Sequence, residues 1–460
     1  MKSSNLDTPA DPAEKSDRRA WAVMAMLLVF MLINYADKAV LGLAANPIMR
    51  ELGLSHSEYG LLASSFFFLF NISAVAFGFL ANRFPTKWLM FGMALVWGFT
   101  QLPVVAGAGF AALLVSRIVL GAAEGPAQPV AMHAAFKWFP NEKRSIPSSL
   151  ISGGGGLGGV LAAPLLTLVI INFGWRWAFL SLFVVGVLWC AVWAVVGREG
   201  TADRAAAPTG AEPEPVENFR VPYHRILLSG TWLAGFVGAF GAYWTSALLL
   251  AWVPSYLETS LGYSAVAAGA IVTAPWVLKT VATFGQGALT QWLMHRGVSS
   301  RVSRGILGGC AVFLAGAAML LAPFVTHPGL KIALITVAFS IGAVKFAIGQ
   351  TINAEITPPA QRGAVLSMTV GLVTLAGLAA PYVTGRIVES AADPAAGFAM
   401  AFAIPGTLML IGGLLAFAFV HPERDARRSP RTGATSAGRR TRARPVRDLS
   451  APASGTSADR

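Results

Sequence analysis

Four ionisable side chains stand inside long apolar stretches of this chain. Asp37 and Lys38 are neighbours in the first stretch, and Arg117 and Glu124 lie in a later one, within SRIVLGAAEGPAQP. A charge at the centre of a bilayer costs about 3 kcal/mol or more, so ionisable groups at that depth are rare and mostly functional. Two cations and two carboxylates are the groups needed to bind an organic anion and to move a proton.

Helical spacing places Arg117 and Glu124 on one face. They are seven residues apart, which is about 20° short of two full turns, so their side chains point the same way. Gln128 extends this polar face by one more turn. The planar guanidinium of Arg117 suits a bidentate contact with a carboxylate, so we expect Arg117 and Gln128 to bind substrate.

The first stretch contributes a second cluster. Asn34 comes three residues before Asp37 and four before Lys38, and Tyr35 lies beside it. We expect Lys38, Tyr35 and Asn34 to contact the substrate. Asp37 and Glu124 are the candidates for proton coupling, because a buried carboxyl group beside cations binds or releases its proton according to what else is bound. The alternative is two buried salt bridges that only neutralise each other.

Polar side chains also interrupt the apolar stretches of the second half. Tyr243, Lys345 and Asn353 are further candidates for substrate contacts, and Lys279 could add positive potential. The alternatives are ordinary polar packing, and lysines whose ammonium groups extend to the membrane surface. The sequence leaves the roles of Lys279 and Lys345 open.

Composition identifies the elements that must position these residues. The chain has 460 residues, of which 55% are hydrophobic and 12% are charged, against about 25% charged in soluble domains. We predict an all-α membrane protein with twelve transmembrane helices. The predicted spans are 20–43, 57–80, 88–108, 110–133, 146–172, 176–196, 225–256, 264–290, 303–324, 330–353, 362–388 and 397–421.

Basic residues concentrate in alternate loops, which predicts that both termini are cytoplasmic. The predicted organisation is a tail (1–19), a six-helix bundle (20–196), a linker (197–224), a second six-helix bundle (225–421) and a basic, disordered tail (422–460). The last segment holds ten Arg and four acidic residues, which suits contact with anionic lipid rather than nucleic acid.

Short motifs recur between the two halves. PNEKR at 140–144 opens one span and PPAQR at 358–362 opens another, at an offset of 218 residues. Two parallel copies of six helices predict two pseudo-symmetric bundles with a site between them, as in alternating-access transporters. No ATP-binding loop, metal-ligand spacing or Ser/His/Asp arrangement occurs, so we expect neither an enzyme nor a cofactor.

Several motifs resemble known families. GFLANRFPTKWL is similar to a loop of the major facilitator superfamily, and NYADK, RIVLGAAEGPAQP, WFPNEKR and GWRWAF resemble its anion:cation symporter family. The resemblance implies that Asp37 and Glu124 couple protons, that Lys38 and Arg117 hold the anion, and that Tyr35 contacts it. Arg is usual where Lys38 stands. Asn82 and Gln291 replace the usual acids of the loop and of its second copy.

The predicted function is a proton-coupled importer of a small organic anion, such as a sugar acid or an aromatic carboxylate. The alternatives are an exchanger of organic anions and a membrane sensor that binds nutrients without carrying them. The expected partners are the anion, protons and the lipid bilayer, and the expected location is a bacterial inner membrane, with the monomer as the functional unit.

Overall fold

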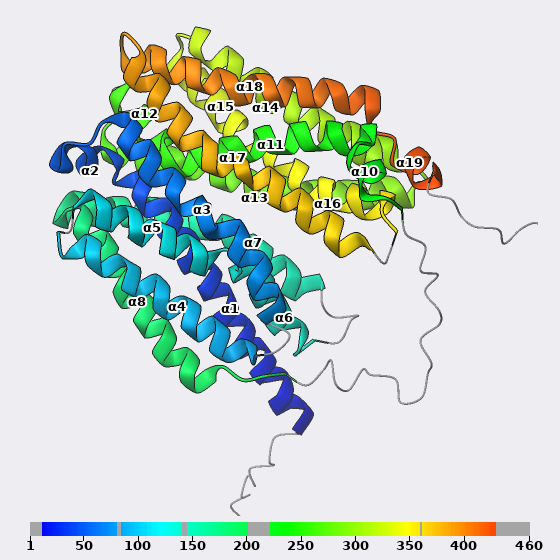
Figure 1. Cartoon of the computed structure of the whole chain (residues 1–460), viewed down its shortest axis with the longest axis horizontal. Coiled ribbons are helices and arrows are strands. Elements are labelled where there is room, and N and C mark those ends of the chain that lie inside the picture. Colours follow the sequence, from blue (N-terminus) through cyan, green and yellow to red (C-terminus); the bar gives the residue numbers. More distant parts are fainter. Residues whose placement is uncertain are drawn as a thin grey trace, which may run out of the picture.

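The computed structural model describes residues 12–80, 84–107, 109–139, 145–200, 221–358 and 361–428, and these segments form helices and connecting turns without strands. The long helices form two bundles (Figure 1). The first contains α1 (Pro12–Leu43), α3 (His56–Leu80), α4 (Thr86–Val105), α5 (Phe110–Glu124) with α6 (Ala127–Phe136), α7 (Ser145–Phe173) and α8 (Trp175–Val196). The second contains α11 (Gly230–Ala251), α13 (Ala265–His295), α14 (Leu307–Leu321), α15 (Pro328–Ser340) with α16 (Val344–Ile356), α17 (Arg362–Ser390) and α18 (Pro394–Phe419).

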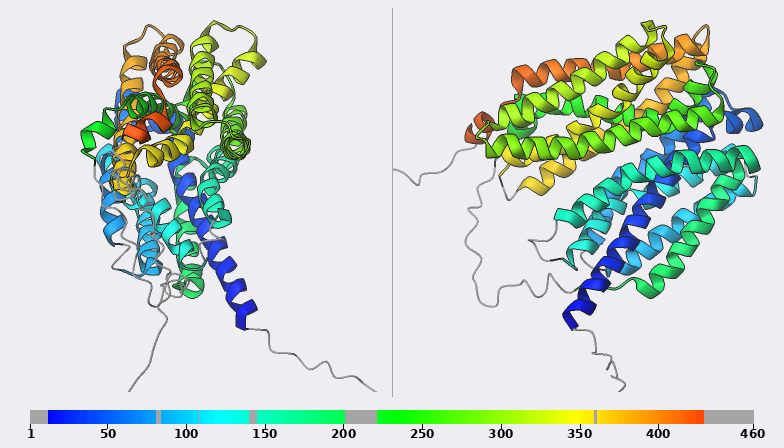
Figure 2. Two further views of the ribbon diagram at one scale, coloured as in Figure 1. Left: turned by 90° about the vertical axis from the view of Figure 1, so that its right-hand side faces the viewer. Right: turned by 180° about the vertical axis from the view of Figure 1, so that it is seen from behind.

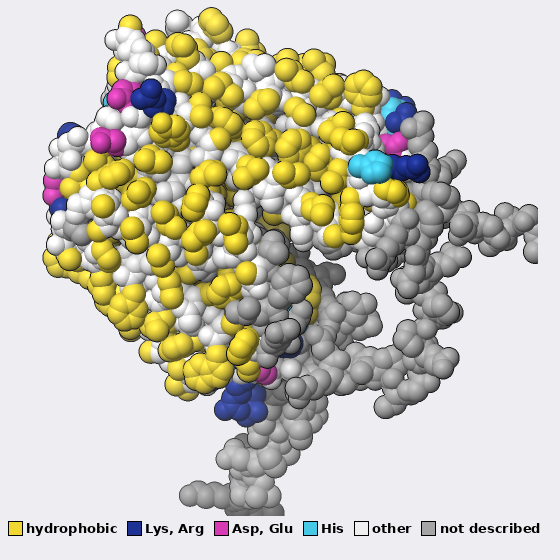
Figure 3. All heavy atoms as spheres, viewed as in Figure 1, with side chains coloured by type: hydrophobic (Ala, Val, Ile, Leu, Met, Phe, Trp, Pro, Cys, Tyr) yellow, Lys and Arg dark blue, Asp and Glu magenta, His cyan; other side chains and the backbone are white. Residues whose placement is uncertain are grey.

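Hydropathy supports a membrane-spanning arrangement. Within the described residues, 11 helical segments are long and apolar enough to cross a bilayer. The 25-residue helix α3 packs against α5 and α17 and completes the predicted twelve. Hydrophobic side chains cover most of the face in Figure 3, and its charged side chains lie toward the two ends. The predicted fold class is therefore confirmed.

Some helix boundaries differ from the prediction. The predicted span 110–133 is two helices, because α5 ends at Glu124 and α6 begins at Ala127, after Gly125 and Pro126. The predicted span 225–256 is broken at Trp252, between α11 and the short helix α12 (Val253–Thr259). A 3-10 turn (Ile341–Ala343) likewise separates α15 from α16.

The predicted tails and linker are partly helical. Helix α1 begins at Pro12, inside the predicted tail of residues 1–19, and α19 (Pro422–Arg428) occupies the start of the predicted disordered tail. Residues 1–11, most of the linker (201–220) and residues 429–460 lie outside the described segments. A short helix, α10 (Tyr223–Leu227), precedes α11.

Polar contacts join the bundles at one end of the molecule. Tyr59 donates a hydrogen bond to the carbonyl oxygen of Ala251 across the interface (3.1 Å). Asn46 in α2 (Ala45–Leu52) donates to Glu258 in α12 (2.8 Å) and accepts from Ser255 (2.7 Å). The bundles converge at α2 and α12 and diverge toward α6 and α16 (Figures 1 and 2).

Glycines permit this close approach. A Cβ atom on Gly42 of α1 would fall 1.7 Å from the carbonyl oxygen of Leu250 in α11, and one on Gly60 of α3 would fall 2.5 Å from that of Pro381 in α17. Any side chain at either position would force the bundles apart. This end is therefore sealed by backbone contact as well as by hydrogen bonds.

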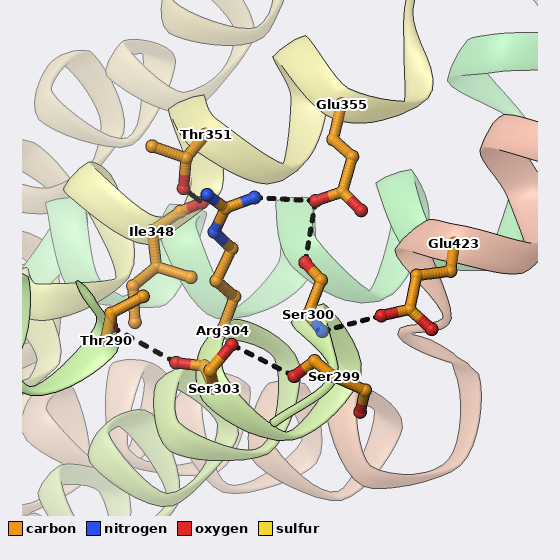
Figure 4. A network of polar contacts seen from close by, with 9 residues as sticks. All are labelled: Thr290, Ser299, Ser300, Ser303, Arg304, Ile348, Thr351, Glu355 and Glu423. Atoms are coloured by element: carbon orange, nitrogen blue, oxygen red, sulfur yellow. Dashed lines mark hydrogen bonds and ion pairs between the residues drawn. The ribbon is translucent and has the colours of Figure 1, made fainter. Parts of the chain in front are cut away.

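A polar network ties together the opposite end of the second bundle (Figure 4). Arg304 in the π-helical turn η2 (Arg301–Ile306) forms an ion pair with Glu355 at the end of α16 (2.7 Å). Ser300 donates its hydroxyl to Glu355 (2.6 Å) and its backbone N–H to Glu423 of α19 (2.7 Å). These bonds give Glu355 a structural role away from the central cavity.

Candidate functional site

A cavity of about 430 Å³ lies between the two bundles, within the usual size range of sites for small ligands. Its lining runs from Leu250, beside the sealed contacts, to Thr231 near the start of α11 and Asn353 in α16, so the cavity lies on the open side of the seal. Eight of the ten predicted site residues line this cavity. They are Asn34, Tyr35, Lys38, Glu124, Gln128, Tyr243, Lys345 and Asn353.

Lys38 and Glu124 form the charged centre of the cavity. The Nζ atom of Lys38 is 2.9 Å from Oε2 of Glu124, and the Glu124 side chain is fully buried. Lys38 also donates a hydrogen bond to Oδ1 of Asn34 and lies 4.9 Å from the centre of the Tyr35 ring. Helices α1 and α5 thus supply the ion pair. Asn34 and Tyr35 of α1, together with the Phe66 and Phe70 rings of α3 at 5.8 and 5.7 Å, surround its cation.

Asp37 faces away from this cavity. Its buried carboxylate accepts a hydrogen bond from Nε2 of Gln101 in α4 (3.1 Å). Consecutive helical residues point about 100° apart, so Asp37 and Lys38 enter different spaces although they are neighbours in sequence. Gln101 was not predicted. The sequence feature that could have identified it is a single amide within the apolar stretch WGFTQLP.

Arg117 lies behind Lys38. Its Nη1 donates to the backbone carbonyl of Asp37 (3.3 Å), and its guanidinium carbon lies 5.3 Å from the centre of the Phe179 ring. Arg117 lines a separate space of about 30 Å³, and Lys38 lines both this space and the main cavity. In this conformation Arg117 does not reach the main cavity, so substrate binding by Arg117 remains a prediction.

The second bundle supplies the remaining predicted residues. The Tyr243 ring contacts the rings of Phe67 and Phe346 at centroid distances of 6.1 and 5.7 Å. Asn353 is buried and donates to the hydroxyl of Thr369 (3.3 Å). Lys345 is completely buried. These side chains form the wall that faces Lys38 and Glu124.

Two contacts across the cavity were not predicted. Thr374 of α17 donates to Oδ1 of Asn71 in α3 (2.5 Å). The rings of Tyr35 in α1 and Trp276 in α13 form a T-shaped contact, with centres 5.9 Å apart. All four residues line the cavity. Asn71 stands alone in the apolar stretch FFFLFNIS, which is the signal that could have identified it.

Metal binding finds no support in the described segments, where no group of three or more His, Cys, Asp or Glu side chains is placed to hold an ion. The cavity instead offers cations, one carboxylate, amides and aromatic faces from helices of both bundles. These are the kinds of groups that bind small molecules carrying negative charge.

Comparison with known proteins identifies the family. The model of the Major Facilitator Superfamily matches residues 27–381. The chain belongs to this superfamily. It is therefore a multi-pass membrane transporter and not an enzyme.

Curated relatives cover nearly the whole transporter. It is 26% identical over 412 residues to the hexuronate transporter of Bacillus subtilis (strain 168), covering 87% of this chain and 94% of the relative. It is 24% identical over 434 residues to the D-galactonate transporter of Escherichia coli O6:H1, covering 89% and 97%. A probable sulfoacetate transporter of Cupriavidus necator is 26% identical over 412 residues, covering 87% and 93%.

Solved structures show the same fold. A bacterial homologue of the human lysosomal transporter Spinster, in an inward-facing and unoccupied conformation, aligns with a TM-score of 0.74 at 18% identity, over 89% of this transporter and 98% of that chain. A D-xylose–proton symporter aligns with a TM-score of 0.70 at 17% identity, over 88% and 99%.

Proposed function

We propose that this transporter is a proton-coupled importer of a small organic anion, such as a sugar acid, and that it works by alternating access. Three relatives named as transporters of hexuronate, D-galactonate and sulfoacetate support an anionic substrate. The cavity between the bundles supports the mechanism, because it lies on the open side of one sealed end.

The ion pair between Lys38 and Glu124 carries the proposal. A substrate carboxylate that binds Lys38 competes with Glu124 for the same ammonium group, 2.9 Å away. A buried carboxylate that loses its cation is costly, and binding a proton removes that cost. The site therefore favours binding the anion and the proton together, which is the requirement for symport.

Asp37 and Arg117 form a second layer behind the pair. Arg117 contacts the main-chain carbonyl of Asp37, and Gln101 holds the Asp37 carboxylate. Because Lys38 lines both the main cavity and the space at Arg117, a shift of Lys38 would open a path between them. We assign Arg117 to the bound carboxylate, and Asp37 to proton exchange with Glu124.

The orientation belongs to the same proposal. The excess of Lys and Arg in alternate loops supports cytoplasmic termini. The cavity lining reaches Thr231 and Asn353, toward the end that carries α10 and α19 (Figure 1). The structure then corresponds to the state that releases substrate into the cell, in the inner membrane of a bacterium and as a monomer.

The test is uptake by purified protein in proteoliposomes. Labelled hexuronate or galactonate is supplied with an inward proton gradient, and parallel vesicles at equal pH contain unlabelled anion. Accumulation that depends on the gradient supports symport. Exchange at equal pH without any gradient-driven accumulation would identify an anion exchanger instead.

A further inference from the structure

The wall of the cavity that belongs to the second bundle carries unneutralised positive charge. Lys279 of α13 and Lys345 of α16 both line the cavity. Glu124 is the only carboxylate among the described lining residues, and it is paired with Lys38. No ion pair involving Lys279 or Lys345 occurs within the described part of the chain. The lining thus holds two cations more than it holds acids.

Lys279 has only neutral partners. Its Nζ atom donates a long hydrogen bond to the hydroxyl of Ser246 (3.4 Å) and lies 4.9 Å from the centre of the Trp276 ring. An aromatic face stabilises a cation but does not neutralise it. An anionic group entering the cavity would supply the charge that these neighbours lack.

Lys345 is more deeply buried. Its side chain has no exposed surface, and its Nζ atom has no hydrogen-bond partner in the described segments. The carbon atoms of its side chain pass close to Gly238 and Gly308. A lysine that extended to the membrane surface would show an exposed ammonium group, so that explanation does not hold. A buried cation without a partner is costly.

Aromatic rings connect these cations to the first bundle. Lys38 lies over Tyr35, the Tyr35 and Trp276 rings form a T-shaped contact, and Lys279 lies over Trp276. Lys38 and Lys279 therefore flank one aromatic pair from opposite bundles. A substrate with an acidic group at each end would contact both bundles at once.

We infer that Lys279 and Lys345 form a second anion subsite, and that the transported substrate is a dianion whose second acidic group this subsite binds. The inference rests on the proposed transport of organic anions and names the class within it. The described residues that line the cavity include three lysines and one glutamate. With Glu124 protonated, as in the proposed symport, a dianion leaves one of the three positive charges uncompensated, whereas a monoanion leaves two.

The test compares acids that share a carbon skeleton and differ in one acidic group. Suitable pairs are D-gluconate with D-glucarate, benzoate with phthalate, and acetate with sulfoacetate. Melting temperatures of the purified full-length protein identify the pairs that bind, since a ligand raises apparent stability. Calorimetry then gives each Kd. We expect the diacid to bind at least about tenfold more tightly than its monoacid, as for one added charge-assisted contact.

Variants assign the preference to the two lysines. Lys279→Gln is expected to remove the preference for the diacid by weakening diacid binding far more than monoacid binding, and Lys279→Arg is expected to retain the preference. Lys345→Met, which keeps the shape of a buried side chain without its charge, is expected to weaken diacid binding in the same way. Lys331→Gln is the matched control, because Lys331 does not line the cavity.

The outcomes separate the two levels of the proposal. Equal binding of monoacid and diacid by the wild type would overturn the second subsite and leave organic-anion transport standing. A diacid preference that survives in both Lys279→Gln and Lys345→Met would also overturn it. Binding of no acid from any pair, with no uptake in proteoliposomes, would overturn the proposed function and the subsite together.

Discussion

At the scale of single residues, the two charged side chains of α1 contact partners on two different helices. Lys38 contacts Glu124 of α5, whereas its sequence neighbour Asp37 contacts Gln101 of α4. The sequence singled out these four groups, because charges in apolar stretches are conspicuous, and of the four the structure places Lys38 and Glu124 at the main cavity. It could not predict the pairing, since that depends on how α1 is rotated against its neighbours. Arg117, expected at the substrate, lies behind Lys38 for the same reason.

Glu124→Gln should separate exchange from accumulation. The amide keeps the size of the side chain but neither binds nor releases a transported proton, and Lys38 loses its competing carboxylate. We expect counterflow at equal pH to persist and accumulation driven by a proton gradient to fall to background. Proteoliposome uptake under both conditions measures this.

Glu58→Gln is the matched control for that experiment. Glu58 is exposed at the start of α3 and accepts a hydrogen bond from the backbone of Ser55, far from the cavity lining. The Glu58→Gln variant should keep both counterflow and gradient-driven accumulation. Gradient-driven accumulation by Glu124→Gln at the wild-type level would remove Glu124 from proton coupling, and loss of counterflow as well would point to a structural role.

Arg117→Ala should weaken binding of every carboxylate substrate by about tenfold or more, the effect expected for a lost charge-assisted contact. Arg176→Ala is a suitable control, because Arg176 pairs with Glu51 outside the cavity. Calorimetry with the best-binding acid measures the affinity of both variants. Wild-type affinity in Arg117→Ala would exclude Arg117 from the substrate site.

At the scale of helices, the glycine run of α7 explains how three helices meet beside the cavity. A Cβ on Gly155 would fall 2.5 Å from the Tyr35 ring of α1, and one on Gly159 would fall 2.3 Å from the Trp276 ring of α13. Small residues such as those of the run SGGGGLGG allow helices to pack closely, and here they bring α7 against α1 and α13. The partners of each glycine were not predictable, because they come from helices far away in the sequence.

Gly159→Val should destabilise the protein. The added side chain has no room beside Trp276, and overpacking of this kind costs about 1–3 kcal/mol. Gly287→Ala is the control, since nothing lies within 4 Å of a Cβ at Gly287. We expect a lower melting temperature in detergent for Gly159→Val and an unchanged or higher one for Gly287→Ala. Equal melting temperatures would mean that α7 and α13 separate easily.

At the scale of the whole molecule, the sequence predicted two bundles but not their relative tilt. Hydropathy and the repeated motifs determine the number of helices and their parallel arrangement. The conformation depends on contacts such as Tyr59 with Ala251 and Asn46 with Glu258. These contacts join residues from different halves, and the proposed alternating access requires that they break. A hydropathy pattern that is compatible with two conformations does not indicate which of them is more stable.

The sealed end should respond to pH through Glu258. Burial against α2 raises the pKa of this carboxyl group above its usual value, and the hydrogen bond from Asn46 and the charge of Arg50 lower it to a smaller extent. The protonated form is thus favoured when the end is sealed, and solvent exposure after opening returns the pKa toward normal. Acid should stabilise the seal, and a rise in pH through the raised pKa should weaken it.

Distances between spin labels on α2 and α12 measure this opening of the sealed end, with Cys190 and Cys310 replaced. We expect the separated population to grow as pH rises in the wild type and to stay small at all pH values in Glu258→Gln, whose amide retains a bond with Asn46 without a charge. An identical pH response in that variant would assign the switch to another group.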